Sequence, residues 1–249
     1  MTLWVSCDGP RHIDPLGGTL YRLVESQEQI ATLSYVDTLE EQAVLEELLE
    51  QVKPRYPKSA SGYHYLLQTP FRYPPLRWGS RFGQVHEPGI LYGGCSITTT
   101  LAESAYYRLV FWHSMPPHPS KRSIDSAHTL FSVPYHSAHG ITLHKSPFSD
   151  YNATLTHPSD YTQTQLLGTA MRNAGVDLFE YVSARDTDAG LCAGLFTPTA
   201  LSQKVPASMH QWLCETRADR VMFKPLSQNT VYTFPDVQFM IDGRLPIPA

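Results

Sequence analysis

Four polar side chains of different chemistry are spread along the sequence: Arg81, Tyr92, Glu103 and Ser183. A guanidinium binds anions through several hydrogen bonds at once. A carboxylate stabilises developing positive charge, and a phenol or a hydroxyl group positions a ligand by hydrogen bonding. Tyr92 and Glu103 follow Arg81 at equal intervals. If Tyr92 ends a strand and Glu103 lies in the first turn of the next helix, both side chains face one cleft with Arg81.

Taken singly, each of these residues also has a plain structural explanation. Glu103 fits a solvated carboxylate at a helix start, which the helix dipole favours. Tyr92 fits a core residue, and Ser183 an ordinary serine where a strand ends. No G-x-S-x-G motif surrounds Ser183, so the sequence gives little support to an acyl-transfer hydrolase.

The segment 69–83 around Arg81 is rich in arginine, aromatic residues and proline. Such a loop can hold a pyrophosphate by bidentate hydrogen bonds while its rings stack on planar ligand groups. Alternatively, the loop is structural, and its arginines stack on Tyr73 and Trp78 and face solvent. Composition alone does not separate these two readings.

Histidines crowd the middle of the chain, and four cysteines are widely spaced. The crowded histidines are His113, His118, His128, His136, His139, His144 and His157. None forms an H-E-x-x-H motif and no cysteine has ligand spacing, so we expect no metal site. The cysteines are Cys7, Cys95, Cys192 and Cys214. A chain of this length needs no disulfides to fold, so we expect free thiols.

Alternating helix and strand patterns predict a mixed α+β domain. In the first half we expect a strand at 19–24, a helix at 38–53, a long ordered loop at 54–90 and a strand at 90–92. Thr38 and Glu41 form the capping box of that helix. A second helix, capped by one of the three threonines 98–100, reaches about residue 112.

The second half contains more predicted strands than helices. We expect a helix capped by Ser159 or Asp160, a short helix at 210–213, and strands at 128–136, 176–182, 191–196, 221–223 and 231–234. No Gly-rich turn of a dinucleotide-binding βαβ unit is present, which favours α+β over a doubly wound sheet.

Composition and charge exclude several classes of protein. The formal net charge is −4 and the isoelectric point is near 6.2, and the basic residues are scattered, so nucleic acid is not an expected partner. No stretch reaches the roughly 18 apolar residues of a membrane span, and no signal-peptide core follows the N-terminus. We therefore expect a cytoplasmic protein.

The motifs around the four polar residues resemble one family. They are Gly79-Ser80-Arg81-Phe82-Gly83, Ile90-Leu91-Tyr92, Thr100-Leu101-Ala102-Glu103 and Glu180-Tyr181-Val182-Ser183-Ala184-Arg185, supported by Tyr21-Arg22, Asp160-Tyr161 with Gln165, and Leu195-Phe196. In this order they resemble the RES domain over residues 19–200. The resemblance implies one compact domain over 1–249, similar to the ADP-ribosyltransferase toxin fold, with insertions at 23–70 and 112–158.

The resemblance also implies an activity and partners. Members of the family degrade NAD⁺, several as phosphorylases that transfer ADP-ribose onto inorganic phosphate. They act as toxins of bacterial toxin–antitoxin pairs, each silenced by an Xre-like antitoxin. NAD⁺ is thus expected as the substrate and phosphate as the co-substrate, with no resident cofactor.

Residue roles follow from the same resemblance. Arg81 would bind the NAD⁺ phosphates, and Arg22 would be a second phosphate contact. Tyr92 would line the nicotinamide–ribose region, Glu103 would polarise the ribose, and Ser183 would hold the nicotinamide. Gly83 departs from the family pattern, which usually has a polar residue there, so one ligand contact is expected to be missing.

Three alternatives remain open on the sequence. A protein ADP-ribosyltransferase would share the site and differ in the acceptor. A non-catalytic nucleotide-binding or interaction module would retain the fold without releasing nicotinamide. An unrelated metal hydrolase using the histidines would require a bound metal.

Overall fold

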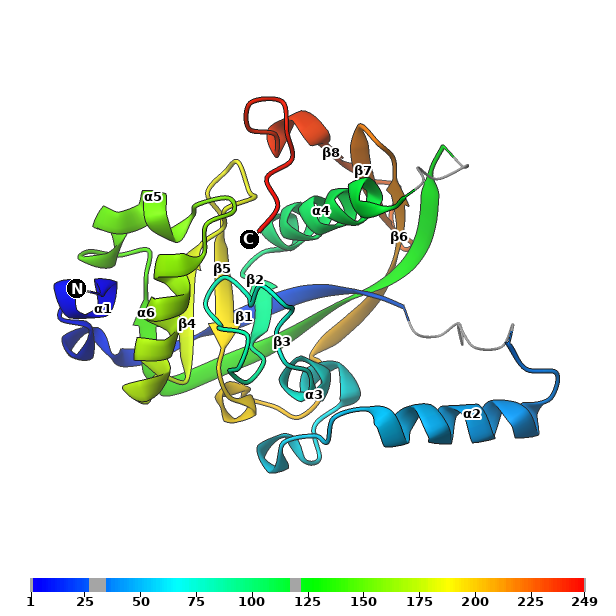
Figure 1. Cartoon of the computed structure of the whole chain (residues 1–249), viewed down its shortest axis with the longest axis horizontal. Helices are drawn as coiled ribbons and strands as arrows, with labels where there is room; N and C mark the ends of the chain where they lie inside the picture. Colours follow the sequence, from blue (N-terminus) through cyan, green and yellow to red (C-terminus); the bar gives the residue numbers. More distant parts are fainter. Residues whose placement is uncertain (1, 27–34, 117–121, 249) are drawn as a thin grey trace.

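Two long antiparallel strands, β1 (Asp14–Glu25) and β3 (Ile124–Thr142), form the centre of the computed structural model, which describes residues 2–26, 35–116 and 122–248 (Figure 1). They pair along almost the whole of β1, from Asp14 opposite Gly140 to Glu25 opposite His128. The other strands are β2 (Leu91–Gly94), β4 (Leu178–Val182), β5 (Leu191–Leu195), β6 (Ser208–Thr216), β7 (Arg220–Pro225) and β8 (Tyr232–Pro235).

The eight strands of the described residues belong to one sheet, in the order β1-β2-β5-β4-β3-β6-β7-β8. Because β1 also pairs with β3, the pairings β1–β2–β5–β4–β3 return to β1 and close a circuit. Only the β3–β4 pairing is parallel among the described ladders. β6, β7 and β8 extend the sheet beyond this circuit from the first half of β3.

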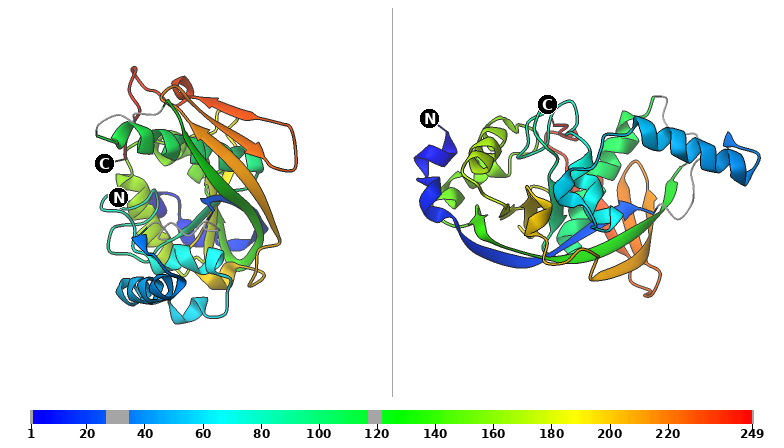
Figure 2. Two further views of the ribbon diagram at one scale, coloured as in Figure 1. Left: turned by 90° about the vertical axis from the view of Figure 1, so that its right-hand side faces the viewer. Right: turned by 90° about the horizontal axis from the view of Figure 1, so that it is seen from below.

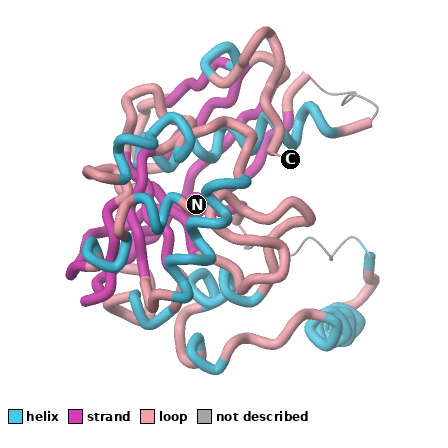
Figure 3. Tube along the Cα trace, turned by 60° about the vertical axis from the view of Figure 1, so that its left-hand side comes forward, coloured by secondary structure: helices cyan, strands magenta, loops and turns pink. Residues whose placement is uncertain are grey.

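The helices of the described residues surround this strongly curved sheet, except that α2 (Leu39–Val52) projects away from it (Figure 2). The other helices are α1 (Leu3–Ser6), α3 (Tyr65–Arg72), α4 (Ile97–Ser114), α5 (Asn152–Leu155) and α6 (Thr162–Asn173). Short 3₁₀ turns lie at Gly9–His12, Lys58–Ala60, Phe148–Tyr151, Pro198–Ala200 and Asp236–Gln238. Figure 3 shows how much of the chain between elements is loop, in keeping with 20 prolines and 15 glycines.

Three clusters of buried apolar side chains place the helices. α4 packs through Leu101 and Leu109 against Trp212 of β6. α3 packs through Leu67 in a second cluster that includes residues of β1 and β3. α6 and α1 share the third cluster with β4. Burial of these apolar faces, rather than helix propensity, fixes α1, α3, α4 and α6 on the sheet.

The mixed α+β class expected from the sequence is confirmed, as are the strands at 19–24, 90–92 and 128–136 and those of the second half. The helix at 38–53 is α2, and the Thr38 side chain accepts a hydrogen bond from the Glu41 amide. All four cysteines are free thiols, as expected. No helix within the described ranges is long and apolar enough to cross a membrane.

Some local predictions are wrong. The expected helix at 210–213 is the middle of β6, where Trp212, Cys214 and Thr216 are buried and alternate with residues that face outward. The expected loop at 54–90 contains α3. This helix was not predicted because Pro70, a residue that disfavours helix interiors, lies inside it. The N-cap of α4 is Ser96 rather than a threonine.

Candidate functional site

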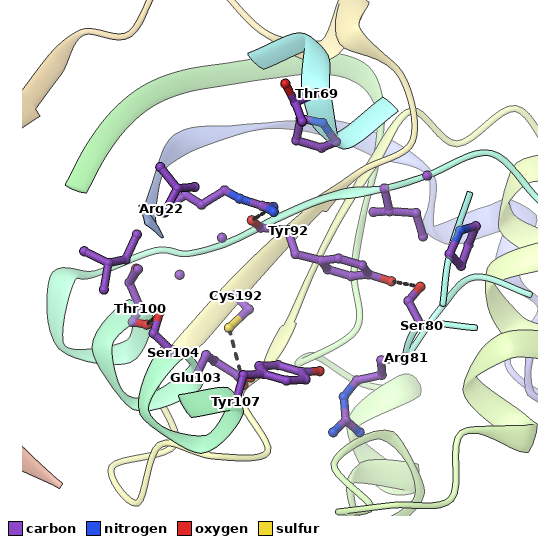
Figure 4. A pocket seen from close by; sticks show the side chains of 18 of the residues that line it. Arg22, Thr69, Ser80, Arg81, Tyr92, Thr100, Glu103, Ser104, Tyr107 and Cys192 are labelled. Carbon is purple, nitrogen blue, oxygen red and sulfur yellow. Dashed lines mark hydrogen bonds between the residues drawn. The ribbon is translucent and has the colours of Figure 1, made fainter. Parts of the chain in front are cut away.

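A pocket of about 700 Å³ opens between α4, β1, β2, α3 and the segment 73–81. Four of the five residues expected at the site line it: Arg22 from β1, Arg81 from the loop before β2, Tyr92 from β2 and Glu103 from α4. Figure 4 shows these side chains around one space. Cavities of this size are typical of small-molecule sites.

Glu103 reaches the pocket from the second turn of α4, not from the first turn as expected. Ser96 caps the helix, and its Oγ accepts a hydrogen bond from the Thr99 amide at 3.1 Å. Glu103 therefore lies beyond the reach of the helix-end charge. Its carboxylate is oriented instead by a neighbouring side chain.

That side chain is Ser183, which directly follows β4. The Ser183 Oγ accepts hydrogen bonds from the amides of Arg185 and Asp186 at 3.1 and 3.0 Å. Its own proton is then free for Glu103 Oε1, 2.5 Å away. Ser183 is only 4% exposed and is not among the lining residues, so it lies behind Glu103 rather than in the pocket.

The loop after Ser183 is bound to the start of α4. Asp186 Oδ2 accepts a hydrogen bond of 2.8 Å from Thr99 Oγ1. Cys192, on β5, places its Sγ 4.0 Å from Glu103 Oε1. The carboxylate is thus held from two directions, by the serine loop and by β5.

Arg81 is buried at the other side of the pocket. Its Nη1 donates to the carbonyl oxygens of Leu155 and His157 at 3.1 and 2.8 Å, and its guanidinium lies 4.5 Å from the ring centre of Tyr161. Burial alone lowers its pKa, but the interactions with Tyr161, Glu103 and two further tyrosines together outweigh this effect, and the pKa of Arg81 is raised. The guanidinium therefore stays charged and serves in binding.

The backbone of the Arg81 loop is fixed by α6. Gln165 Nε2 donates to the carbonyl oxygens of Trp78 and Ser80 at 2.9 and 3.1 Å. Gly79 has a φ of +81°, a conformation that glycine adopts without strain. The loop thus turns tightly and presents Arg81 to the pocket.

Tyr92 contacts both Arg22 and the loop that carries Arg81. Its phenol oxygen accepts a hydrogen bond of 3.1 Å from the Phe82 amide and lies 3.0 Å from Ser80 Oγ. Its carbonyl oxygen accepts a bond of 2.8 Å from Arg22 Nη1. Figure 4 shows the side chain lying between Arg22 and Ser80. Burial raises the pKa of Tyr92 to about 12, so the phenol stays neutral.

Three arginines near the pocket have no carboxylate of a described residue at ion-pair distance. Within the described part of the chain, no ion pair with a carboxylate is formed by Arg22, Arg81 or Arg185. Burial lowers the pKa of Arg22, which shows the cost of holding its charge there. A ligand with negative charge would offset that cost.

Sequence reasoning missed several residues of the site. Tyr107 lines the pocket one helical turn after Glu103, and Ser80 lines it beside Arg81. Arg185 does not line the pocket itself; 5% exposed, it stacks on Tyr106 with its guanidinium 3.4 Å from the ring centre. The spacing of four residues from Glu103 was a usable signal for Tyr107, whereas no sequence signal pairs Arg185 with Tyr106.

No histidine cluster suited to a metal occurs in the described ranges, where no group of three or more His, Cys, Asp and Glu side chains could hold an ion. His157 is used locally: its Nδ1 accepts from the amides of Ser159 and Asp160 at 3.3 and 2.8 Å. The turn that His157 stabilises is the one whose carbonyl oxygens bind Arg81.

Comparisons with known proteins give a family. A chain of the crystal structure of the M. tuberculosis MbcT–MbcA toxin–antitoxin complex is similar at 11% identity and a TM-score of 0.47, covering 82% of this chain and 91% of that one. No curated protein matches the sequence. The sequence model of the RES domain matches residues 56–216, which include Arg81, Tyr92, Glu103 and Ser183. Since this match spans well over half of the sequence, the chain belongs to the RES domain family.

Proposed function

We propose that the protein binds NAD⁺ in this pocket and breaks its nicotinamide–ribose bond. One observation supports this most: the Glu103 carboxylate, held by Ser183 at 2.5 Å, opens into the same cavity as Arg22 and Arg81. A dinucleotide presents both complementary parts, an anionic pyrophosphate and a ribose that becomes cationic when nicotinamide leaves.

The chemistry follows from these residue types. The C–N bond breaks with its electron pair going to nicotinamide, which leaves as a neutral molecule. The ribose passes through an oxocarbenium-like state, whose positive charge Glu103 stabilises. An acceptor oxygen then bonds to the same carbon. We propose inorganic phosphate as that acceptor, which makes the protein an NAD⁺ phosphorylase.

Binding falls to the other residues. Arg81 and Arg22 hold the pyrophosphate, because guanidinium groups match phosphate oxygens bidentately. Tyr92 uses its phenol oxygen for Ser80 and Phe82, which leaves its ring to line the ribose end. Ser183 was expected to contact nicotinamide. Its burial behind Glu103 favours orienting the carboxylate instead.

We further propose that the protein acts in the cytoplasm as the toxin of a toxin–antitoxin pair, with an Xre-like antitoxin. The family membership supports this biological role, and depletion of NAD⁺ would supply the toxicity. Neutralisation then requires only that the pocket be covered or its walls displaced.

The activity is tested by incubating the pure protein with NAD⁺, with and without phosphate, and identifying the products by mass spectrometry. We expect free nicotinamide together with a phosphorylated ADP-ribose in the reaction that contains phosphate, and little release of nicotinamide in the reaction without it. ADP-ribose alone would make the enzyme a glycohydrolase. ADP-ribose attached to a protein would indicate a protein ADP-ribosyltransferase, and unchanged NAD⁺ a non-catalytic module.

A further inference from the structure

Helix α2 leaves its apolar face uncovered. Val44, Leu48 and Val52 follow one another at intervals of four and are 57%, 55% and 80% exposed. Residues at this spacing share one face of a helix, and such a face is normally buried. Figures 1 and 2 show α2 projecting from the rest of the molecule. The face is thus available to another molecule.

The chain just before the helix turns this face into a groove. Tyr35 and Val36 lie beside it, and with Val44, Leu45, Leu48 and Leu49 they line an open groove of about 670 Å³. We call these six residues the α2 groove. Exposed apolar areas that are continuous in this way mark interaction sites.

The surroundings of the groove are mainly acidic. Six exposed acidic residues occur at 37–50, of which Glu50, at the end of the helix, is paired with Arg72 and Lys53; the other five are Asp37, Glu40, Glu41, Glu46 and Glu47. Glu40 and Glu41 lie at the groove itself. A second copy of this helix would set acid against acid, which costs affinity. A basic partner would gain from the same charges.

Helix α2 is connected by an ion pair to α3, which lines the proposed NAD⁺ pocket. Glu50, at the end of α2, forms an ion pair of 2.5 Å with Arg72 of α3. Arg72 is 8% exposed and lies 4.1 Å from the ring centre of Tyr56. α3 in turn lines the pocket through Tyr65 and Thr69. The C-terminal end of α2 is therefore attached to an element that lines the pocket.

We propose that the α2 groove docks a protein partner whose contact helix presents apolar side chains at intervals of three and four, flanked by Lys and Arg. Such a helix lays its apolar face in the groove while its basic residues meet the acidic ones. The proposal goes beyond the catalytic function, because nothing in it depends on NAD⁺.

Two synthetic helical peptides with the same leucine face test this, one flanked by lysines and one by glutamates. Binding to the full chain is measured by fluorescence anisotropy. At low salt we expect the lysine peptide to bind at least about tenfold more tightly, and the ratio to shrink as salt screens the charges. Equal binding of both peptides, or no binding of the lysine peptide, would overturn the proposal.

Variants locate the binding. Leu48→Asp should abolish it, and Glu40→Lys/Glu47→Lys should reverse the preference between the peptides. Val237→Asp, at a valine that is 72% exposed outside α2, is the matched control and should leave binding unchanged. Equal weakening by Val237→Asp would contradict the assignment.

Two further readouts complete the test. Sedimentation should show a monomer at micromolar concentration; a dimer that Leu48→Asp dissociates would assign the groove to a second copy and overturn the proposal. Leu48→Asp should release nicotinamide from NAD⁺ at the same rate as the wild-type chain. Loss of peptide binding with unchanged turnover in this variant separates the docking proposal from the proposed catalytic function.

Discussion

At the scale of single residues, Ser183 shows how a buried hydroxyl can orient a carboxylate. Two backbone amides occupy its acceptor sites, and its own proton is directed to Glu103. The loop that supplies these amides is itself bound to α4 through Thr99 and Asp186. The position of Glu103 therefore depends on a chain of hydrogen bonds that starts at the cap of its own helix.

Ser183→Ala should separate orientation from binding. Without the hydroxyl, the carboxylate loses its partner, and kcat should fall roughly ten- to a hundredfold, as small displacements of reacting groups do. KM for NAD⁺ should change little, because the arginines remain. Steady-state kinetics check this, with exposed Ser202→Ala as the control. A rise in KM at constant kcat would mean instead that Ser183 contacts the substrate.

Tyr92→Phe should act on binding. The change leaves the Phe82 amide without its acceptor, which costs about 1–3 kcal/mol of stability where the amide is buried. It also frees Ser80, so the Arg81 loop loses its support. We expect KM for NAD⁺ to rise more than kcat falls, in a folded protein. An unchanged KM would show that the loop holds Arg81 without the phenol.

At the scale of elements, the contact between α6 and the Arg81 loop is unusually close. A Cβ atom placed on Gly168 of α6 would lie 1.8 Å from the Phe82 carbonyl oxygen. Glycine at this position lets the helix pack directly on the loop backbone. α6 therefore positions Arg81 through this contact and through Gln165.

Gly168→Ala should destabilise the protein, although alanine favours helices by about 1 kcal/mol over glycine. The overlap with Phe82 should cost more than that gain, about 1–3 kcal/mol net. Urea unfolding measures the change, and Gln163→Ala at an exposed position of α6 is the control. A more stable Gly168→Ala variant would show that α6 does not rest on the loop.

The predictability of each element depended on how local its signal was. α2 was predictable because its cap and its periodicity lie within sixteen residues. α3 was not predictable, because the proline Pro70 in its last turn is more typical of a loop. This helix is stabilised instead by tertiary burial of Leu67 and Phe71. β6 pairs with β3, about eighty residues earlier, and such a partner cannot be read from a local pattern.

At the scale of the whole molecule, the fold brings together pairs of residues that the sequence separates by 70 and 80 positions. The closed circuit of β1 to β5 sets Arg22 beside Tyr92 and Glu103 beside Ser183. Family-like motifs were enough to name these residues. The burial of Ser183 and the support of Arg81 by Leu155 and His157 follow from tertiary packing, so the sequence could not show them.

Acid stability should depend on His128. Burial, helped by the charge of Arg108, lowers its pKa from 6.5 to about 4. Between pH 6.5 and 4 the unfolded chain binds a proton at His128 that the folded chain does not bind. The free energy of unfolding therefore falls as the pH drops through this range. The full loss is about 3 kcal/mol.

Urea unfolding of wild type and His128→Gln across this pH range measures the effect. The variant should lose less stability than wild type as the pH falls. His210→Gln, at an exposed position of β6, should follow wild type. Parallel curves for wild type and His128→Gln would show that His128 takes up its proton equally in both states.

The central claim concerns Glu103, and nicotinamide release from NAD⁺ by wild-type protein and by Glu103→Gln tests it most directly. The amide keeps the shape of the side chain and removes its charge, so the folded variant should release nicotinamide roughly a hundred- to a thousandfold more slowly, as loss of a charge-stabilising group does. Chromatography of the free base gives both rates. Equal rates from two folded proteins would contradict the account.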